Sequence, residues 1–228
     1  VSLMQPGSTA MPSLALTASA PPQSAGEIAI LDAAVNLFSV HGYDGVSMRR
    51  IAEAAGVSKA NIYHHFASKE ALYFAIMRRS AEELSLLLEN LAEGKGSFTQ
   101  RLQVFASAHL EHLFDHSERV RLVLREAFSG DEVKSRMVVE QMVGGLVHRM
   151  IAIFEAGQKA GLLRADLDPG LCATLLMGSD LFYFQAHGLL QQIPEAGFVR
   201  NPGQYSQQMI DVLLNGMLAQ PAGKGTGR

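Results

Sequence analysis

The chain lacks the residues that mark several specialised classes of protein. Its 228 residues include one cysteine, Cys172, and no tryptophan. A single cysteine excludes a disulfide within the chain and fits the reducing cytoplasm, where we expect the protein to act. Because Leu171, Ala173 and Leu175 surround it, we expect Cys172 to be a buried, unreactive thiol and not a redox sensor.

Long hydrophobic runs are absent too. None approaches the roughly 20 apolar residues that a membrane-spanning helix needs, so we expect no membrane segment. The first charged residue is Glu27, and the stretch before it is rich in Ala, Ser and Pro. This stretch has neither the basic start nor the continuous apolar centre of a secretory signal, and we interpret residues 1–26 as a disordered tail.

The sequence also lacks the motifs of common enzymes. It contains no phosphate-binding loop, no G-x-S-x-G, no H-E-x-x-H and no Cys–His pair at a telling spacing. Glu111 and Asp115 are neighbours on one helix surface, but a solvated face explains them better than acid–base chemistry. We therefore expect neither catalysis nor a cofactor.

Positive charge is scarce. The net charge is −3, and between Glu27 and Arg79 six Lys and Arg residues face five Asp and Glu residues. A polyanion such as DNA would have to be held by individually placed contacts, and by pairing two copies of the chain, because no broad positive field is present.

Against these absences, residues 47–72 carry the strongest local signal. Ser47, Ser58 and Ser68 each stand where a helix should begin, and serine is among the best N-caps because its hydroxyl accepts a free backbone N–H. A small apolar residue precedes each serine and a larger one follows four positions later, the spacing of a hydrophobic staple. The pairs are Val46 and Ile51, Val57 and Ile62, and Ala67 and Leu72. Gly56 suits the left-handed end of the first short helix, so the stretch predicts a helix–turn–helix of the kind that enters a DNA major groove.

The second short helix has one buried and one open face. Ile62 and Phe66 fall together on a helical wheel and should face the core of the small domain. Ala60 and His64 then point the opposite way, with Asn61 and Tyr63 on the flanks and Lys59 at the amino end of the helix. Asn can bridge adenine, Ala can pack on a thymine methyl, and Lys can reach guanine or phosphate.

Phosphate contacts are expected around this helix. Tyr63 and Lys69 could hold the DNA backbone, Arg49 could add charge, and the capped helix starts at Ser47 and Ser68 offer backbone N–H groups. The predicted DNA-binding set is Ser47, Arg49, Ser58, Lys59, Ala60, Asn61, Tyr63, His64, Ser68 and Lys69. Three ordinary, well-capped surface helices are the alternative.

Residues 28–72 resemble the DNA-binding domain of TetR-family transcriptional regulators. The residues that carry the resemblance are Ala33, Phe38, Gly42, Tyr43, Ser47, Ile51, Ala52, Ala55, Gly56, Val57, Ser58, Ile62, Tyr63, Phe66, Lys69, Glu70 and Leu72. The resemblance implies that Tyr63 and Lys69 touch phosphates. It covers about a fifth of the chain, and the family varies at the positions of His64 and His65, so it does not give the operator sequence.

The rest of the chain is helical by pattern. Further helices are expected over residues 68–93, 98–115, 118–128, from about 131 to 160, 169–190 and 204–218, with a loop over 191–203. The fold class is therefore all-α: a three-helix DNA-binding domain (27–72), a larger helical ligand-binding and dimerisation domain (73–220) and a flexible tail (221–228), with about nine helices in total. This is the layout that the TetR resemblance implies.

The last two helices are the expected dimer seam. One face of the eighth helix carries Gly178, Leu181, Phe182 and Gln185, and the ninth carries Met209, Leu213, Gly216 and Met217. These residues could instead serve only the core of one chain. We expect a homodimer, because one short recognition helix reads few base pairs.

Three histidines share one helix in the larger domain. His109, His112 and His116 could together bind a divalent metal. The alternative is that His109 points inward and hydrogen-bonds a ligand or a neighbouring helix, while the other two are solvated. We expect no metal.

An effector site is implied by the resemblance, since TetR-like proteins commonly hold a small molecule in the larger domain. The expected lining is Phe105, His109, Phe128, Met142 and Phe182, although Met and Phe at helical spacing are also ordinary core residues. Gly144 and Gly145 either allow close packing or leave room for the ligand.

The sequence thus predicts a DNA-binding transcriptional regulator. By resemblance it acts as a repressor, released from a palindromic operator by a small, largely apolar effector. The alternatives are a helical protein-interaction adaptor and a metal-responsive regulator that uses His109, His112 and His116.

Overall fold

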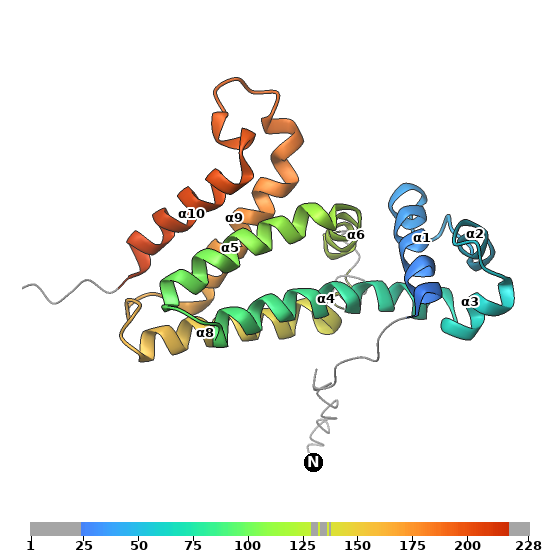
Figure 1. Cartoon of the computed structure of the whole chain (residues 1–228), viewed down its shortest axis with the longest axis horizontal. Coiled ribbons are helices and arrows are strands. Elements are labelled where there is room, and N and C mark those ends of the chain that lie inside the picture. The colour runs from blue at the N-terminus through green and yellow to red at the C-terminus, as the bar shows by residue number, and fades with distance from the viewer. Residues whose placement is uncertain (1–23, 129–131, 133–135, 137, 219–228) are drawn as a thin grey trace, which may run out of the picture.

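The computed structural model describes residues 24–128, 132, 136 and 138–218, apart from the side chains of Gln141 and Met142 (Figure 1). Over these residues the fold is all-α, and the only β-type pairing is an isolated bridge between Leu163 and Leu218. The α-helices are α1 (Ala25–His41), α2 (Met48–Ala54), α3 (Lys59–His65), α4 (Lys69–Glu93), α5 (Phe98–Asp115), α6 (Ser117–Ala127), α8 (Gly144–Lys159), α9 (Pro169–Leu190) and α10 (Pro202–Met217). No helix in the described part of the chain is both long enough and apolar enough to cross a membrane.

The first three helices form a small domain whose geometry is set by local capping. The hydroxyls of Ser47, Ser58 and Ser68 accept the backbone N–H of the residue three positions on, at 3.2, 3.1 and 3.0 Å. Gly56 adopts a left-handed φ of 67° where the chain leaves α2, as predicted. The caps therefore lie where the sequence places them.

The first helix begins slightly before the predicted start of the small domain. Ser24 caps α1, which starts at Ala25, so the last residues of the expected 1–26 tail are helical. Residues 1–23 of that tail, and the whole of the expected 221–228 tail, lie outside the described residues.

α4 belongs to both domains. Its first turns, with Leu72 and Ile76, pack into the same cluster as Phe38, Ile51 and Ile62 of the small domain. Its later turns pack into the core of the larger domain, which is built from α4, α5, α8, α9 and α10. Figure 1 shows α4 running from the α1–α3 lobe along the length of the larger domain. α4 therefore connects the cores of the two domains.

Two elements differ from the sequence prediction. The expected long helix before Ala160 contains a π-helix, η1 (Val139–Val143), and α8 starts only at Gly144. Two consecutive glycines resist regular α-helix and make a change of winding inexpensive. The expected start of this helix, near residue 131, lies outside the described residues.

The expected loop over residues 191–203 contains a short 3-10 helix, η2 (Gly197–Arg200). Val199 is fully buried there, and its carbonyl accepts a 2.8 Å hydrogen bond from the Tyr183 hydroxyl. This contact fixes the connection onto α9, so the segment is an ordered part of the fold.

Candidate nucleic-acid interface and effector site

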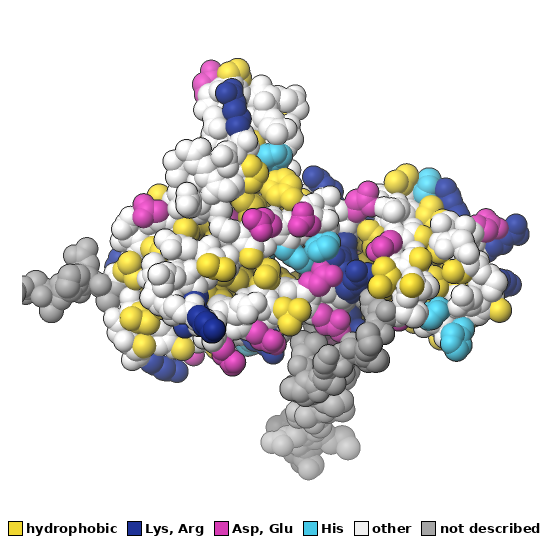
Figure 2. Space-filling view, viewed as in Figure 1, with side chains coloured by type: hydrophobic (Ala, Val, Ile, Leu, Met, Phe, Trp, Pro, Cys, Tyr) yellow, Lys and Arg dark blue, Asp and Glu magenta, His cyan; other side chains and the backbone are white. Residues whose placement is uncertain are grey.

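α3 presents the face that the sequence predicts for DNA. Ile62 is buried in the small-domain core, whereas Lys59, Ala60, Asn61, Tyr63 and His64 are all exposed. Ser47, Arg49, Ser58 and Ser68 are exposed around them. Figure 2 shows Lys and Arg side chains along the outer edge of the lobe formed by α1–α3. The arrangement can place one short helix, flanked by hydrogen-bond donors, against a nucleic-acid groove.

Lys69 is the one predicted DNA contact that the fold partly encloses. Its ammonium donates to the carbonyls of Tyr43 and Val46 at 2.9 and 3.0 Å, and it lies 4.2 Å from the centre of the Tyr43 ring. Lys69 thus ties the start of α4 to the connection between α1 and α2, which leaves one of its three donors for a phosphate. The sequence contains one indication of this structural role. A lysine at a helix N-terminus is repelled by the helix dipole, so nearby acceptors are expected to offset its charge.

The two arginines of α2 already have partners on the protein. Arg49 Nε lies 2.8 Å from Glu53 Oε1, and Arg50 Nη2 lies 2.7 Å from His41 Nε2. Both contacts are solvent-exposed, so each stabilises the fold little and can be exchanged for a phosphate.

In the larger domain, His109 pairs with a residue that the sequence analysis missed. His109 Nδ1 lies 2.8 Å from Asp180 Oδ2, and the His109 ring stacks on Phe105 with 5.6 Å between centroids. Asp180 is 0% exposed, and burial raises the pKa of its carboxyl. Its other oxygen, Oδ1, has no hydrogen-bond partner among the described residues. The available signal was that Asp180 is the only charged residue within α9.

The remaining expected effector residues do not gather around this pair. Phe128 is 77% exposed at the end of α6, and Phe182 is 67% exposed on α9, so neither lines an interior pocket with Phe105 and His109. Phe182 faces outward because the next two residues of α9, Tyr183 and Phe184, are the ones whose side chains face the core. The side chain of Met142 lies outside the described residues.

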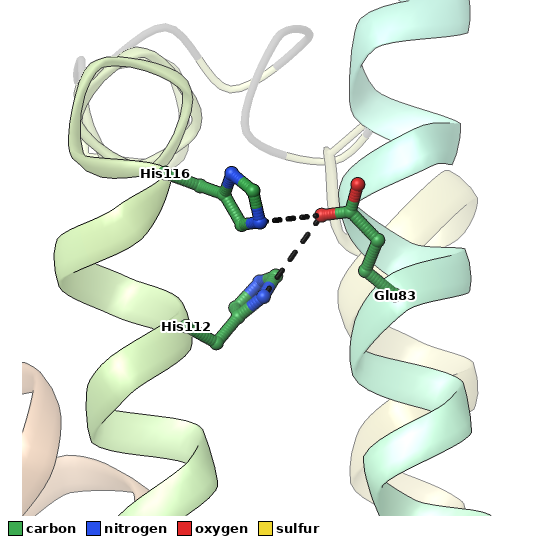
Figure 3. Close-up of side chains that lie close together, drawn as sticks. All are labelled: Glu83, His112 and His116. Carbon is green, nitrogen blue, oxygen red and sulfur yellow. Dashed lines mark ion pairs between the residues drawn. The ribbon is translucent and has the colours of Figure 1, made fainter.

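The three histidines do not face one another, so the alternative of a metal site built from all three does not match the structure. His109 faces Asp180, whereas His112 and His116 turn toward Glu83 of α4 (Figure 3). The expectation that His112 is solvated is wrong: its side chain is 12% exposed, and burial together with the neighbouring His116 lowers its pKa to about 4. α4 covers this face of α5, which the periodicity of α5 alone cannot reveal.

The predicted dimer seam is partly exposed. Gly178, Phe182, Gln185 and Gly216 lie at the surface of α9 and α10, and Leu181, Met209 and Leu213 are half-buried. Met217 is buried in the core of the larger domain, so its assignment to the seam is corrected. Leu175, Leu189 and Val212 add exposed apolar surface to these two helices beyond the residues predicted for the seam.

A three-helix DNA-binding domain joined by a shared helix to a larger helical domain defines a DNA-binding transcriptional regulator, and the comparisons agree. Residues 30–76 match the family described as bacterial regulatory proteins, tetR family, and residues 99–211 match a tetracyclin repressor-like C-terminal domain. The HTH-type transcriptional regulator RutR of Escherichia coli (strain K12) is 31% identical over 165 residues, which cover 70% of this chain and 74% of RutR. The chain belongs to the TetR family.

Solved structures share the same fold. The structure of a SmeT–triclosan complex superposes with a TM-score of 0.69 at 21% identity, covering 88% of this chain and 94% of that one. The ketosteroid transcriptional regulator KstR2 of Mycobacterium tuberculosis gives a TM-score of 0.64 at 20% identity, covering 87% of this chain and 98% of that one. At these identities the likeness establishes the fold.

Proposed function

We propose that the protein is a cytoplasmic repressor that binds a near-palindromic operator as a homodimer and leaves it when a small, largely apolar effector enters its larger domain. The observation that carries the DNA-binding part is the open face of α3, where Ala60 is exposed opposite the buried Ile62, with Asn61 exposed on the flank and Lys59 exposed at the amino end. Family membership supports the same reading.

Each side chain of this face has a chemical role in the proposal. Asn61 reads adenine, Ala60 packs on a thymine methyl, and Lys59 reaches guanine or phosphate. His64 lies beside Ala60 on the same open face, and Tyr63 holds the backbone with the helix starts at Ser47 and Ser68.

Dimerisation would occur through α9 and α10. Phe182 and Val212 are large apolar side chains left exposed on these helices, and burying them against a second copy removes apolar surface from water. Two-fold symmetry would then present two copies of α3 about 34 Å apart, one turn of DNA.

The effector would meet the buried pair formed by His109 and Asp180. Because Asp180 Oδ1 lacks a partner among the described residues, we infer that the effector carries one hydrogen-bond donor on an otherwise apolar body. SmeT, which shares this fold, has been solved with triclosan, and KstR2 is described as a ketosteroid regulator.

Coupling between the two sites would run through α4. This helix starts beside α3 and packs along α5 and α8, so an effector that favours another tilt of α4 changes the spacing of the two recognition helices. The effector can shift DNA affinity only by its differential affinity for the two arrangements, typically about 1–3 kcal/mol.

The test is selection of bound sequences from random DNA with the full chain and with Asn61→Ala and Tyr63→Phe. We expect an inverted repeat for the unmodified protein. Asn61→Ala should relax preference at one position of each half-site, at a cost of about 1–3 kcal/mol, while Tyr63→Phe should weaken all sequences alike. Absence of any enriched sequence would favour a protein-interaction adaptor instead.

A further inference from the structure

A second cluster of chemically active side chains lies where the small domain meets the larger one. Glu83 of α4 and the pair His112 and His116 at the end of α5 point toward one another (Figure 3). His116 Nε2 lies 3.5 Å from Glu83 Oε2, and His112 Nδ1 lies 3.9 Å from the same oxygen. One potential ligand atom from each residue falls within 4.8 Å of the other two.

This donor set has the chemistry of a transition-metal site. Two imidazole nitrogens and one carboxylate oxygen are typical ligands for Zn²⁺ and similar divalent ions, with water completing the coordination. Bonds of about 2.1 Å in a tetrahedron place the ligand atoms about 3.4 Å apart. The contact between His116 and Glu83 already has this spacing, and a small rotation of His112 would bring the third ligand into place.

The carboxylate is also held in the way that metal ligands usually are. Arg119 donates to both oxygens of Glu83, at 3.0 and 2.7 Å, and Arg79 Nε lies 3.3 Å from Oε1. Each carboxylate oxygen accepts more than one partner, so Oε2 can keep its bond from Arg119 and still face the histidines. Such outer hydrogen bonds orient ligating carboxylates.

The same arginines limit how tightly a cation is held. Their two positive charges oppose a divalent ion, although Asp32 lies 3.6 Å from Arg79 and offsets part of that charge. We therefore expect a reversible site, weaker than a closed structural zinc site.

An ion can reach the cluster from solvent. A cavity of about 460 Å³ lies between α1, α4 and the start of α6, and His116, Arg79 and Arg119 line it. The side chain of His116 is 37% exposed, so at least one ligand is accessible without unfolding.

We propose that Glu83, His112 and His116 bind one divalent transition-metal ion of the Zn²⁺ class and thereby join α4 to α5 beside the small domain. The site is separate from the proposed effector site at His109 and Asp180. A bound ion would restrict movement of α4 relative to α5, the same helix that connects the DNA-binding domain to the rest of the molecule.

The test is metal titration of the full chain without any histidine tag, after chelator treatment and dialysis. Zn²⁺ affinity is measured by competition with a chromophoric chelator, and Co²⁺ is titrated by visible absorption. We expect one ion per chain, tetrahedral Co²⁺ bands and a higher melting temperature with Zn²⁺. His116→Ala and His112→Ala should each weaken Zn²⁺ binding more than about tenfold. Loss of a residue that only hydrogen-bonds a ligand already costs about tenfold or more, and loss of a ligand itself should cost at least as much.

The matched control is His148→Ala, which removes an exposed histidine of α8 outside the cluster and should leave affinity unchanged. His116 is partly exposed, so His116→Ala should fold normally, as circular dichroism without metal would verify. If the unmodified chain binds no ion, or if His116→Ala binds as tightly as the unmodified chain, the proposed site is wrong.

Discussion

At the scale of single residues, Lys69 shows how the fold adds a role that sequence reasoning did not assign. Its ammonium joins two carbonyls that are 23 and 26 positions away in the chain. A motif can mark the residue as functional, but only the packed structure brings those carbonyls together. Asp180 was missed for the same reason, because its partner His109 lies 71 positions away.

Replacing Lys69 with alanine should therefore reduce stability as well as DNA affinity. Loss of the charged donor removes one hydrogen bond from each of two part-buried carbonyls, although the Tyr43 carbonyl still accepts the Val46 N–H at 3.4 Å, and we expect a decrease of about 1–3 kcal/mol in the free energy of unfolding. Denaturant titration measures it. Lys59→Ala, at an exposed position of α3, should weaken DNA binding without changing stability. Equal stability of the Lys69 variant and the unmodified chain would contradict the structural role.

The buried carboxyl of Asp180 should make stability depend on pH. Burial raises the folded pKa of Asp180 above the ordinary value of 3.8. The hydrogen bond with His109 opposes this shift in part, and Tyr205 also lies near the carboxyl. A raised folded pKa means that the folded state holds the proton more tightly. The protonated Asp180 therefore contributes to the free energy of unfolding below pH 3.8, and this contribution is lost as pH rises through the folded pKa.

Asp180→Asn should remove the decrease in stability that accompanies ionisation of the buried carboxyl. The stability of the variant relative to the unmodified chain should therefore increase as pH rises from about 4 toward neutrality. Unfolding by denaturant at a series of pH values gives the two curves. Parallel curves would show that Asp180 has no raised pKa in the folded state.

At the scale of helices, the sequence predicts starts and stops better than orientations. The caps at Ser47, Ser58 and Ser68 depend on atoms three residues away, so local chemistry determines them. By contrast α9 is apolar on every side, and its pattern cannot tell that Tyr183 faces inward while Phe182 faces outward. The inward position of His109 was predictable, because α5 separates polar from apolar residues.

The turn between α2 and α3 offers a direct test of this local control. Gly56 has φ 67° and nothing within 4 Å of an added Cβ, so Gly56→Ala should cost only the left-handed strain, about 1–2 kcal/mol. Gly188→Ala, on a helix with equally open surroundings, should instead be neutral or stabilising by up to about 1 kcal/mol. Denaturant unfolding compares them, and a loss at Gly188 as large as at Gly56 would contradict the argument.

At the scale of the whole molecule, the proposed function requires α9 and α10 to form an interface between two chains. Phe182→Glu places a charge on the exposed face of α9 and should convert the dimer to a folded monomer. Sedimentation at micromolar concentration measures the state, and Val40→Glu, at an exposed position of α1, is the control. Persistence of the dimer in the Phe182 variant would move the interface elsewhere.

The modest charge of the small domain also leads us to expect that two chains pair on DNA. With six basic and five acidic residues between Glu27 and Arg79, one copy has little non-specific attraction for DNA. The short α3 reads only a few base pairs, so we expect both affinity and specificity to come from two copies on one site.

The most direct measurement compares the affinity of the full chain for a selected operator with its affinity for a single half-site at the same salt concentration. We expect that a dimer binds the complete operator and that removal of one half-site weakens binding by orders of magnitude, because half of the phosphate and base contacts are lost. A monomer that binds the lone half-site with the affinity of the complete operator would contradict it.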